Sequence, residues 1–215
     1  MFEAGKKLIC KTGIFNMTTS RIISLTEDEI DEGLRQMKTE LVMGEGKDAV
    51  TLHARKIEDK RLPVIWAGNP GCPTPEAIFY ENVLSSAKEP IIDLLTCGSL
   101  TDVDGFPVKG NHPTEVIATC RELEYLRKAL RAVGRPGMGM LAAESAVTEI
   151  GDLAAASHNR LRPCDSHLVA MFNELIIDNG NMIRAARSLD YGMKNASLAC
   201  TMVGGLSGDA PGATL

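Results

Sequence analysis

The side chains best suited to chemistry stand together at Asp165-Ser166-His167. A carboxylate, a hydroxyl and an imidazole are the groups of a hydrolytic triad, but three consecutive residues cannot form one. In an extended segment neighbouring side chains point to opposite faces, so only Asp165 and His167 share a side. The pattern therefore favours a hydrogen-bonded pair that fixes a turn over a triad.

Three other carboxylates were weighed as candidate functional groups. Asp93 interrupts the apolar run 91–96. Because an unpaired buried charge costs several kcal/mol, we expect Asp93 near the polar end of a strand or beside a partner. Glu144 and Glu174 are less informative on spacing alone, since glutamates in helices usually face solvent.

The glycine-rich segment 134–139 invites comparison with phosphate-binding loops. A dinucleotide fingerprint requires G-x-G-x-x-G between a strand and a helix, whereas a helical pattern precedes these glycines and Pro136 lacks an amide hydrogen. No Gly-Lys-Ser/Thr follows, which excludes a P-loop, and 205–208 lacks the spacing of a nucleophile elbow. A plain helix-to-strand connection and a ligand-facing loop are equally compatible with the segment.

The composition is that of a folded chain long enough to bury a core. Its 215 residues are 44% hydrophobic and 24% charged, which excludes disordered and fibrous classes; the length fits one large or two small domains, and we take residues 1–215 as one. A net charge of -5 without a basic run argues against nucleic acid or an anionic membrane as partner. The cysteines and histidines lack metal-binding spacing, and neither a signal peptide nor a membrane-spanning run is visible, so we expect a cytoplasmic protein without a metal.

Helical and strand patterns alternate along the chain. A capping box at Thr26 opens an amphipathic helix that carries apolar residues as far as Leu41 and ends at Gly44. The other predicted helices lie at about 75–88, 113–133 and 170–189, with an Ala-rich stretch at 142–156. The predicted strands lie at 63–67, 91–96, up to 141 and 196–203, with a long loop at 99–111 and a turn or strand end at 164–167.

This alternation predicts an α/β fold with a parallel sheet. An open doubly wound sheet and a (β/α)8 barrel both place chemistry at the carboxyl ends of strands. A barrel needs eight strands and ~250 residues, whereas four or five strands are visible here. The pattern alone therefore favours the open sheet.

A resemblance to a known family changes this expectation. The run Ala132-Val133-Gly134-Arg135-Pro136-Gly137-Met138-Gly139 closely resembles the segment of methanogen monomethylamine methyltransferases that leads into their amber-encoded residue, pyrrolysine. Other segments resemble the same family in the same order, over essentially the whole chain. They are 12–15, 25–30, 44–50, Asp165-Ser166-His167, 173–175 and Gly204-Gly205.

The resemblance implies a TIM-barrel-type (β/α)8 fold with its active site in a central cavity. In that family a methylamine adds to the imine carbon of pyrrolysine, and the adduct presents its methyl group to cobalt(I) of a separate corrinoid protein. No cofactor is then bound directly, because the corrinoid (cobalamin) is carried by the partner protein. The implied catalytic residues are Glu144, Asp165 and His167, and the backbone of Gly137, Met138 and Gly139 is implied as the pocket floor.

Two positions depart from the family pattern. Leu141 stands at the position of pyrrolysine, and Leu168 stands where a glutamate is expected after Asp-Ser-His. Leucine offers neither an imine nor a charge. The joint loss is consistent, because a carboxylate that faced a cationic adduct becomes a costly buried charge without it. Leu141 and Leu168 are expected to line the substrate pocket.

The resemblance covers the middle of a longer family chain, so about half of a barrel is expected here. An open half-barrel exposes two sheet edges and an apolar interior. We therefore expect either a homo-oligomer in which another copy completes the barrel or a truncated reading frame.

Two functions follow as hypotheses. The first is a methyltransferase of the monomethylamine:corrinoid type, active in methanogenesis, that lacks pyrrolysine and takes a small N-methyl substrate that is already cationic. The alternative is a catalytically inactive truncated homologue or oligomerisation module. An unrelated hydrolase or dehydrogenase would need a nucleophile and base or a glycine fingerprint, and neither has the required spacing.

Overall fold

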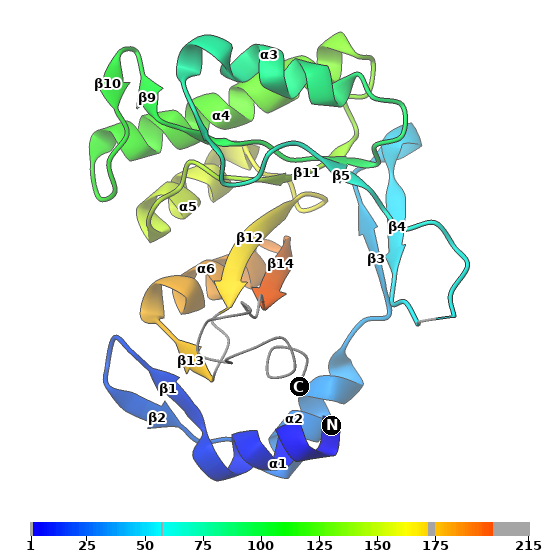
Figure 1. Cartoon of the computed structure of the whole chain (residues 1–215), viewed down its shortest axis with the longest axis vertical. Helices are drawn as coiled ribbons and strands as arrows, with labels where there is room; N and C mark the ends of the chain where they lie inside the picture. The colour runs from blue at the N-terminus through cyan, green and yellow to red at the C-terminus, as the bar shows by residue number, and fades with distance from the viewer. Residues whose placement is uncertain (1, 57, 172–174, 200–215) are drawn as a thin grey trace, which may run out of the picture. The chain divides into compact units, whose positions relative to one another are not determined.

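The computed structural model in Figure 1 describes residues 2–56, 58–171 and 175–199. The chain divides into two compact units. One unit comprises Met1–Lys38, Val169–Ile183 and Ser197–Leu215, and the other comprises Thr39–Leu168 and Arg184–Ala196. The single domain expected over residues 1–215 stays a prediction.

Helices and strands alternate through the described residues. The helices are α1 (Phe2–Thr12), α2 (Glu27–Gln36), α3 (Glu76–Ala87), α4 (Pro113–Ala132), α5 (Glu149–Ala156) and α6 (Asn179–Tyr191), with 3-10 turns at Gly46–Asp48 and Ser157–Asn159. The first strands are β1 (Ile14–Asn16), β2 (Arg21–Ile23), β3 (Glu40–Met43), β4 (Val50–His53), β5 (Trp66–Ala67), β6 (Pro73–Thr74) and β7 (Leu94–Leu95). The remaining strands are β8 (Ser99–Leu100), β9 (Asp102–Val103), β10 (Phe106–Pro107), β11 (Gly139–Ala142), β12 (Ser166–Met171), β13 (Ile176–Ile177) and β14 (Lys194–Ala199).

The central feature is a five-stranded sheet in the order β14-β12-β11-β7-β5. The β5–β7, β7–β11 and β11–β12 pairings are parallel. Strand order follows chain order throughout, and α3, α4, α5 and α6 each lie between two successive strands in the sequence. A doubly wound sheet reverses its strand order at a switch point, and this sheet has no such reversal. The α/β class is confirmed, and the order contradicts the doubly wound arrangement that the strand count favoured.

One face of this sheet packs against α3, α4 and α5. The buried cluster joins Leu95, Met140 and Ala142 of the strands to Phe79 of α3 and Leu126 of α4. Helix α4 contacts both α3 and α5, and Figure 1 shows the three helices on the same side of the strands. Because side chains alternate along a strand, residues at odd positions of β11 point to the other face.

Helix α4 matches its prediction in extent, and its apolar residues Leu123, Leu126 and Leu130 are buried. Its buried residues run through Glu115, Ala118, Glu122, Leu126 and Ala129, at helical spacing. Ile117, one of the apolar residues of the helix predicted at 113–133, is 45% exposed. Two glutamates therefore lie on the buried side of the helix, where a count of apolar residues does not register them.

The other unit holds α1, α2 and a three-stranded sheet in the order β13-β1-β2. The capping box at Thr26 is confirmed, since its hydroxyl accepts the Glu29 amide and the Glu29 carboxylate accepts the Thr26 amide. Helix α2 ends at Gln36, shorter than predicted, because Leu41 belongs to β3, which pairs with β4 in the other unit.

Several predicted boundaries were wrong. The loop expected at 99–111 contains β8, β9 and β10, and the strand at 91–96 shortens to Leu94–Leu95. The helix expected from residue 170 starts at Asn179, because β12 continues to Met171. Glu174, Gly204-Gly205 and the end of the strand predicted to 203 lie outside the described residues. Among the described helices, none is both long and apolar enough to cross a membrane.

Candidate functional site

The register of the sheet separates the predicted site residues onto two faces. Leu141 pairs with Ser166, and Ala142 pairs with His167. Ala142 belongs to the cluster under the helices, so His167 shares the helix face. Leu141, which is 8% exposed, and the half-buried Leu168 lie on the opposite face by alternation. The predicted lining residues thus share one face, and His167 does not.

The turn after β11 is held by the fully buried carboxylate of Glu122. One oxygen, Oε1, accepts the amides of Ala143 at 2.8 Å and Glu144 at 3.0 Å, and Oε2 accepts that of Ser145 at 2.7 Å. The thiol of Cys97 donates to the same carboxylate at 3.1 Å. Ala143 adopts φ +73, a left-handed conformation that costs a non-glycine residue about 1 to 3 kcal/mol and persists only where neighbours hold it.

Glu144 lies in this turn, at the carboxyl ends of the strands. Its main chain is fixed, because its amide bonds to Glu122 and its carbonyl accepts the Ser99 hydroxyl at 2.6 Å. Its side-chain oxygen Oε1 is buried and has no hydrogen-bond partner among the described residues. Burial raises the pKa of Glu144 to about 7, the charge of Glu122 acts in the same direction, and the charge of His167 and the Gly71 amide act against it.

A second unpartnered oxygen lies at the same end of the sheet. Thr96 follows β7, is 2% exposed, and its Oγ1 also has no partner in the described part of the chain. Gly71, whose amide influences Glu144, follows β5. Two neighbouring strands, β7 and β11, are therefore followed by a hydroxyl and a carboxylate that each keep an unpartnered oxygen for a polar ligand, whereas the Gly71 amide already bonds to Glu144. This is the edge at which parallel α/β sheets bind ligands.

His167 is fully engaged within the protein. Its Nδ1 lies 2.9 Å from the carbonyl oxygen of Ala142, and its Nε2 lies 2.7 Å from Oδ1 of Asp152. Both partners only accept, so these contacts favour the doubly protonated ring, the imidazolium. Burial lowers the pKa of His167, but contact with Asp152 and the Ala142 carbonyl outweighs it and the net shift is upward. Arg184 pairs with the other oxygen of Asp152.

Asp165 lies at the opposite end of the sheet, before β12. Its two oxygens accept the Arg162 guanidinium at 2.9 and 3.0 Å, together with the amides of Arg162 and Met140. The side chain is fully buried. No hydrogen bond or ion pair joins it to His167, so the pair expected from alternation is not formed. Such saturation is the environment of a structural ion pair, and the catalytic role of Asp165 stays a prediction without support from its contacts.

Gly137, Met138 and Gly139 also lie at the amino end of β11. The Gly137 amide donates to Asp48 Oδ2 at 3.0 Å, and its carbonyl accepts the Glu45 amide at 2.8 Å. A Cβ on Gly139 would lie 2.8 Å from the Gly44 amide nitrogen, so only glycine fits there. Met138 is fully buried. These residues join β11 to the β3–β4 hairpin, and their role as a pocket floor stays a prediction.

Sequence reasoning missed three residues that shape this site. Glu122 sits on a helix, Asp152 sits on α5, and Thr96 ends an apolar run. A charged residue at the spacing of a buried helical face was the available signal for Glu122. The described residues contain no group of three His, Cys, Asp or Glu side chains placed to hold a metal ion.

Comparisons with known proteins decide the family. The model of the monomethylamine methyltransferase MtmB family matches residues 1–215. The chain belongs to this family. Monomethylamine methyltransferase MtmB2 of Methanosarcina acetivorans is 34% identical over 178 residues, which cover 83% of this chain and 39% of that protein. MtmB of Methanosarcina mazei is 35% identical over 179 residues.

The fold agrees with that of the same family. The crystal structure of the Methanosarcina barkeri monomethylamine methyltransferase superimposes with a TM-score of 0.94 at 31% identity and covers 99% of this chain and 47% of that one. The hydroxylamine complex of MtmB matches equally well. The chain thus spans less than half the length of the MtmB proteins that it matches.

Proposed function

We propose that this chain carries part of the reaction centre of a methyltransferase that takes a methyl group from a small cationic N-methyl compound and passes it to a corrinoid protein. Membership of the monomethylamine methyltransferase family supports methyl transfer. The corrinoid, carried by the partner protein, would supply the cobalt centre that accepts the methyl group. The family match over the whole chain does not favour an inactive module.

Leu141 is proposed to occupy the position of the family's pyrrolysine, on the resemblance of the preceding segment 132–139. A leucine side chain cannot add an amine, so it cannot turn a neutral methylamine into a cationic adduct. A quaternary nitrogen needs no such step, because it leaves with the C–N electron pair as a neutral amine. The inert side chain at 141 therefore favours a donor that arrives already charged.

The unpartnered oxygen of Glu144 carries this proposal. It lies three residues beyond Leu141, at the carboxyl end of the sheet, in a turn whose backbone Glu122 holds. An ionised carboxylate in a partly desolvated site attracts a cation more strongly than one in water. With a pKa of about 7, Glu144 is half-charged at neutral pH, and a bound cation would favour its ionised form.

The strand order supports a TIM-barrel-type fold for the complete enzyme. Five strands in chain order, of which β5, β7, β11 and β12 are parallel, with a helix between each strand and the next, match the repeating pattern of a (β/α)8 barrel. We propose that further strands, from a longer chain or from a second copy in a homo-oligomer, close the barrel.

Binding of a quaternary ammonium tests the proposal directly. We expect choline or glycine betaine to bind and to release protons at pH 6 to 7, because the cation lowers the pKa of Glu144, and to release none at pH 9. Calorimetry in two buffers of different ionisation enthalpy measures this release. The neutral isostere 3,3-dimethylbutanol should bind more weakly and release none.

Glu144→Gln should abolish the proton release and weaken binding roughly tenfold, because it removes the coulombic attraction between the carboxylate and the cation. Glu124→Gln, the same change at an exposed position of α4, should leave both unchanged. Methyl transfer is measured with a purified corrinoid protein and a panel of N-methyl donors. A folded protein that binds none of the cations and methylates no corrinoid would overturn the proposal.

A further inference from the structure

A second candidate site lies at the amino end of the same sheet. Strand β4 and the segment that leads into β5 line a half-open cavity of about 200 Å³. Because β5, β7 and β11 are parallel, the residues before β5 and the turn after β11 lie at opposite ends of the sheet. This cavity is therefore separate from the site that contains Glu144.

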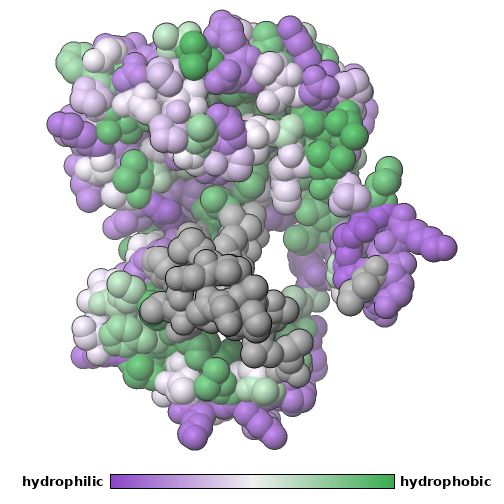
Figure 2. Space-filling view, viewed as in Figure 1, coloured by the Kyte–Doolittle hydropathy of each residue, from purple (hydrophilic) through white to green (hydrophobic). Residues whose placement is uncertain are grey.

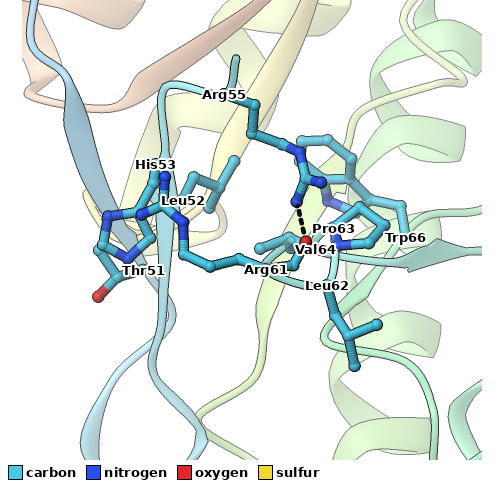
Figure 3. Close-up of a pocket in the computed structure, with 9 residues that line it drawn as sticks. All are labelled: Thr51, Leu52, His53, Arg55, Arg61, Leu62, Pro63, Val64 and Trp66. Carbon is cyan, nitrogen blue, oxygen red and sulfur yellow. Dashed lines mark hydrogen bonds between the residues drawn. The ribbon is translucent and has the colours of Figure 1, made fainter. Parts of the chain in front are cut away.

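The walls of the cavity are basic on one side and apolar on the other. His53, Arg55 and Arg61 supply the basic groups, and no acidic side chain lines it. Leu52, Val64 and Trp66 supply apolar surface, and Figure 3 shows the lining side chains, with Arg55 hydrogen-bonded to the main-chain carbonyl of Arg61. A flat molecule with a negative end fits both walls.

The surface around the cavity is locally basic although the chain is acidic. Residues 53–62 contain four Lys and Arg against two Asp and Glu, within a protein of net charge -5. Figure 2 shows the part of the molecule that projects around β4 as mostly hydrophilic. The apolar side chain of Leu62, which lines the cavity, is nevertheless 90% exposed. A basic patch of this kind on an acidic protein attracts anions selectively.

Arg55 is the basic group of the cavity wall that forms no ion pair with a described residue, although its charge, like that of Arg61, lowers the pKa of Asp59. Arg61 is paired with Asp59, and His53 lies 2.9 Å from Glu40 Oε1. In contrast, the Arg55 guanidinium donates to two main-chain carbonyls, Arg61 O at 2.7 Å and Asp59 O at 3.4 Å. No carboxylate of the described residues lies within 4 Å of it. The carbonyls fix the direction of the guanidinium while leaving its charge available.

We propose that this cavity binds a small organic anion, a phosphate or carboxylate carried on a flat apolar body. Arg55 would hold the anionic group through paired N–H bonds, the geometry in which guanidinium recognises both oxyanions. Trp66 and Val64 would contact the apolar body. His53 and Arg61, already paired, would add long-range attraction.

The position of Trp66 provides a direct readout. It is the single tryptophan of the sequence, so intrinsic fluorescence excited at 295 nm reports on the cavity alone. We expect phenyl phosphate and benzoate to change this fluorescence saturably. Inorganic phosphate and benzyl alcohol, which each carry one half of the ligand, should bind at least about tenfold more weakly. The ratio between phenyl phosphate and benzoate identifies the preferred oxyanion.

Two substitutions test the role of Arg55. Arg55→Gln should weaken binding of phenyl phosphate roughly ten- to hundredfold, the range for loss of a charged hydrogen-bonding group. Lys60→Gln removes one positive charge from the same loop outside the cavity and should change binding less than about twofold. Urea midpoints for both variants establish that the fold is retained. Arg55→Lys keeps the positive charge but loses the paired N–H groups of the guanidinium, so its affinity for phenyl phosphate should fall between those of wild type and Arg55→Gln.

Several outcomes would overturn the proposal. They are a linear, unsaturable fluorescence change, equal binding of benzyl alcohol and phenyl phosphate, or equal losses in Arg55→Gln and Lys60→Gln. Should Arg55→Gln fail to fold, Arg55→Lys decides: unchanged affinity would exclude recognition by the guanidinium. None of these results depends on choline binding at Glu144, so the two proposals succeed or fail separately.

Discussion

The buried carboxylate of Asp165 and the half-buried carboxylate of Glu144, at opposite ends of β11, differ in how completely their oxygens are used. Asp165 accepts a guanidinium and two amides, one of them from Met140 of β11. Glu144, just beyond the other end, keeps an oxygen without a partner. Buried polar atoms are nearly always paired, so the exception marks the end where a ligand is expected. This contrast agrees with a structural role for the amino end of β11 and with the binding role proposed for its carboxyl end.

The largest effect is expected at the saturated end. Asp165→Asn removes the charge that compensates the Arg162 guanidinium in a buried pair, and such changes cost about 3 to 5 kcal/mol of unfolding free energy. Urea unfolding measures it. Asp190→Asn breaks the exposed pair with Arg187 and should cost less than about 1 kcal/mol. Equal costs would remove the distinction between the two ends.

Glu122→Gln should have the second-largest effect on stability. An amide retains one oxygen acceptor for three backbone amides, so we expect a loss of about 1 to 3 kcal/mol. The variant also removes a negative charge near Glu144, so the pKa of Glu144 should fall from about 7 towards its ordinary value. Carbon-13 NMR of the glutamate carboxyls follows that titration. An unmoved pKa would show that Glu122 acts only on the backbone.

The free energy of unfolding should also depend on pH through His167. Its pKa is raised in the folded protein, so the stability it contributes is full below its ordinary pKa of 6.5 and is lost as pH rises through the folded value. The slope cannot exceed about 1.4 kcal/mol per pH unit for one proton. Nitrogen-15 NMR should show an imidazolium at pH 7. A neutral tautomer there would contradict the two-donor assignment.

The smallest effect is expected for Glu144→Gln. The pKa of Glu144 is raised to about 7 from its ordinary 4.5, so its contribution to stability is present below pH 4.5 and is lost as pH rises to about 7. The variant should therefore be more stable than wild type by about 1 kcal/mol at pH 8, a figure reduced for partial solvent exposure. At pH 4 the two should unfold alike. Destabilisation at pH 8 would instead indicate a hidden partner for the carboxylate.

The sequence predicted local features well and long-range partners poorly. The capping box at Thr26 and the extent of α4 follow from neighbouring residues, and both are confirmed. Asp93 was expected near a partner, and it accepts the Ile65 amide at 2.9 Å. The roles of Glu122 and Asp152 depend on residues 21 and 15 positions away, and no local pattern specifies them. Nor could spacing show that β12 turns His167 towards α5.

One consequence concerns the backbone around Leu141. Asp165 fixes the amide before it, Glu122 fixes the three amides from Ala143 to Ser145, and the strands on either side pair with Leu141 and its neighbours. None of these bonds uses the side chain at 141. The backbone at this position is therefore held independently of its side chain. Evolution or protein engineering can exchange the residue at 141 without removing any of the hydrogen bonds that hold the main chain around it.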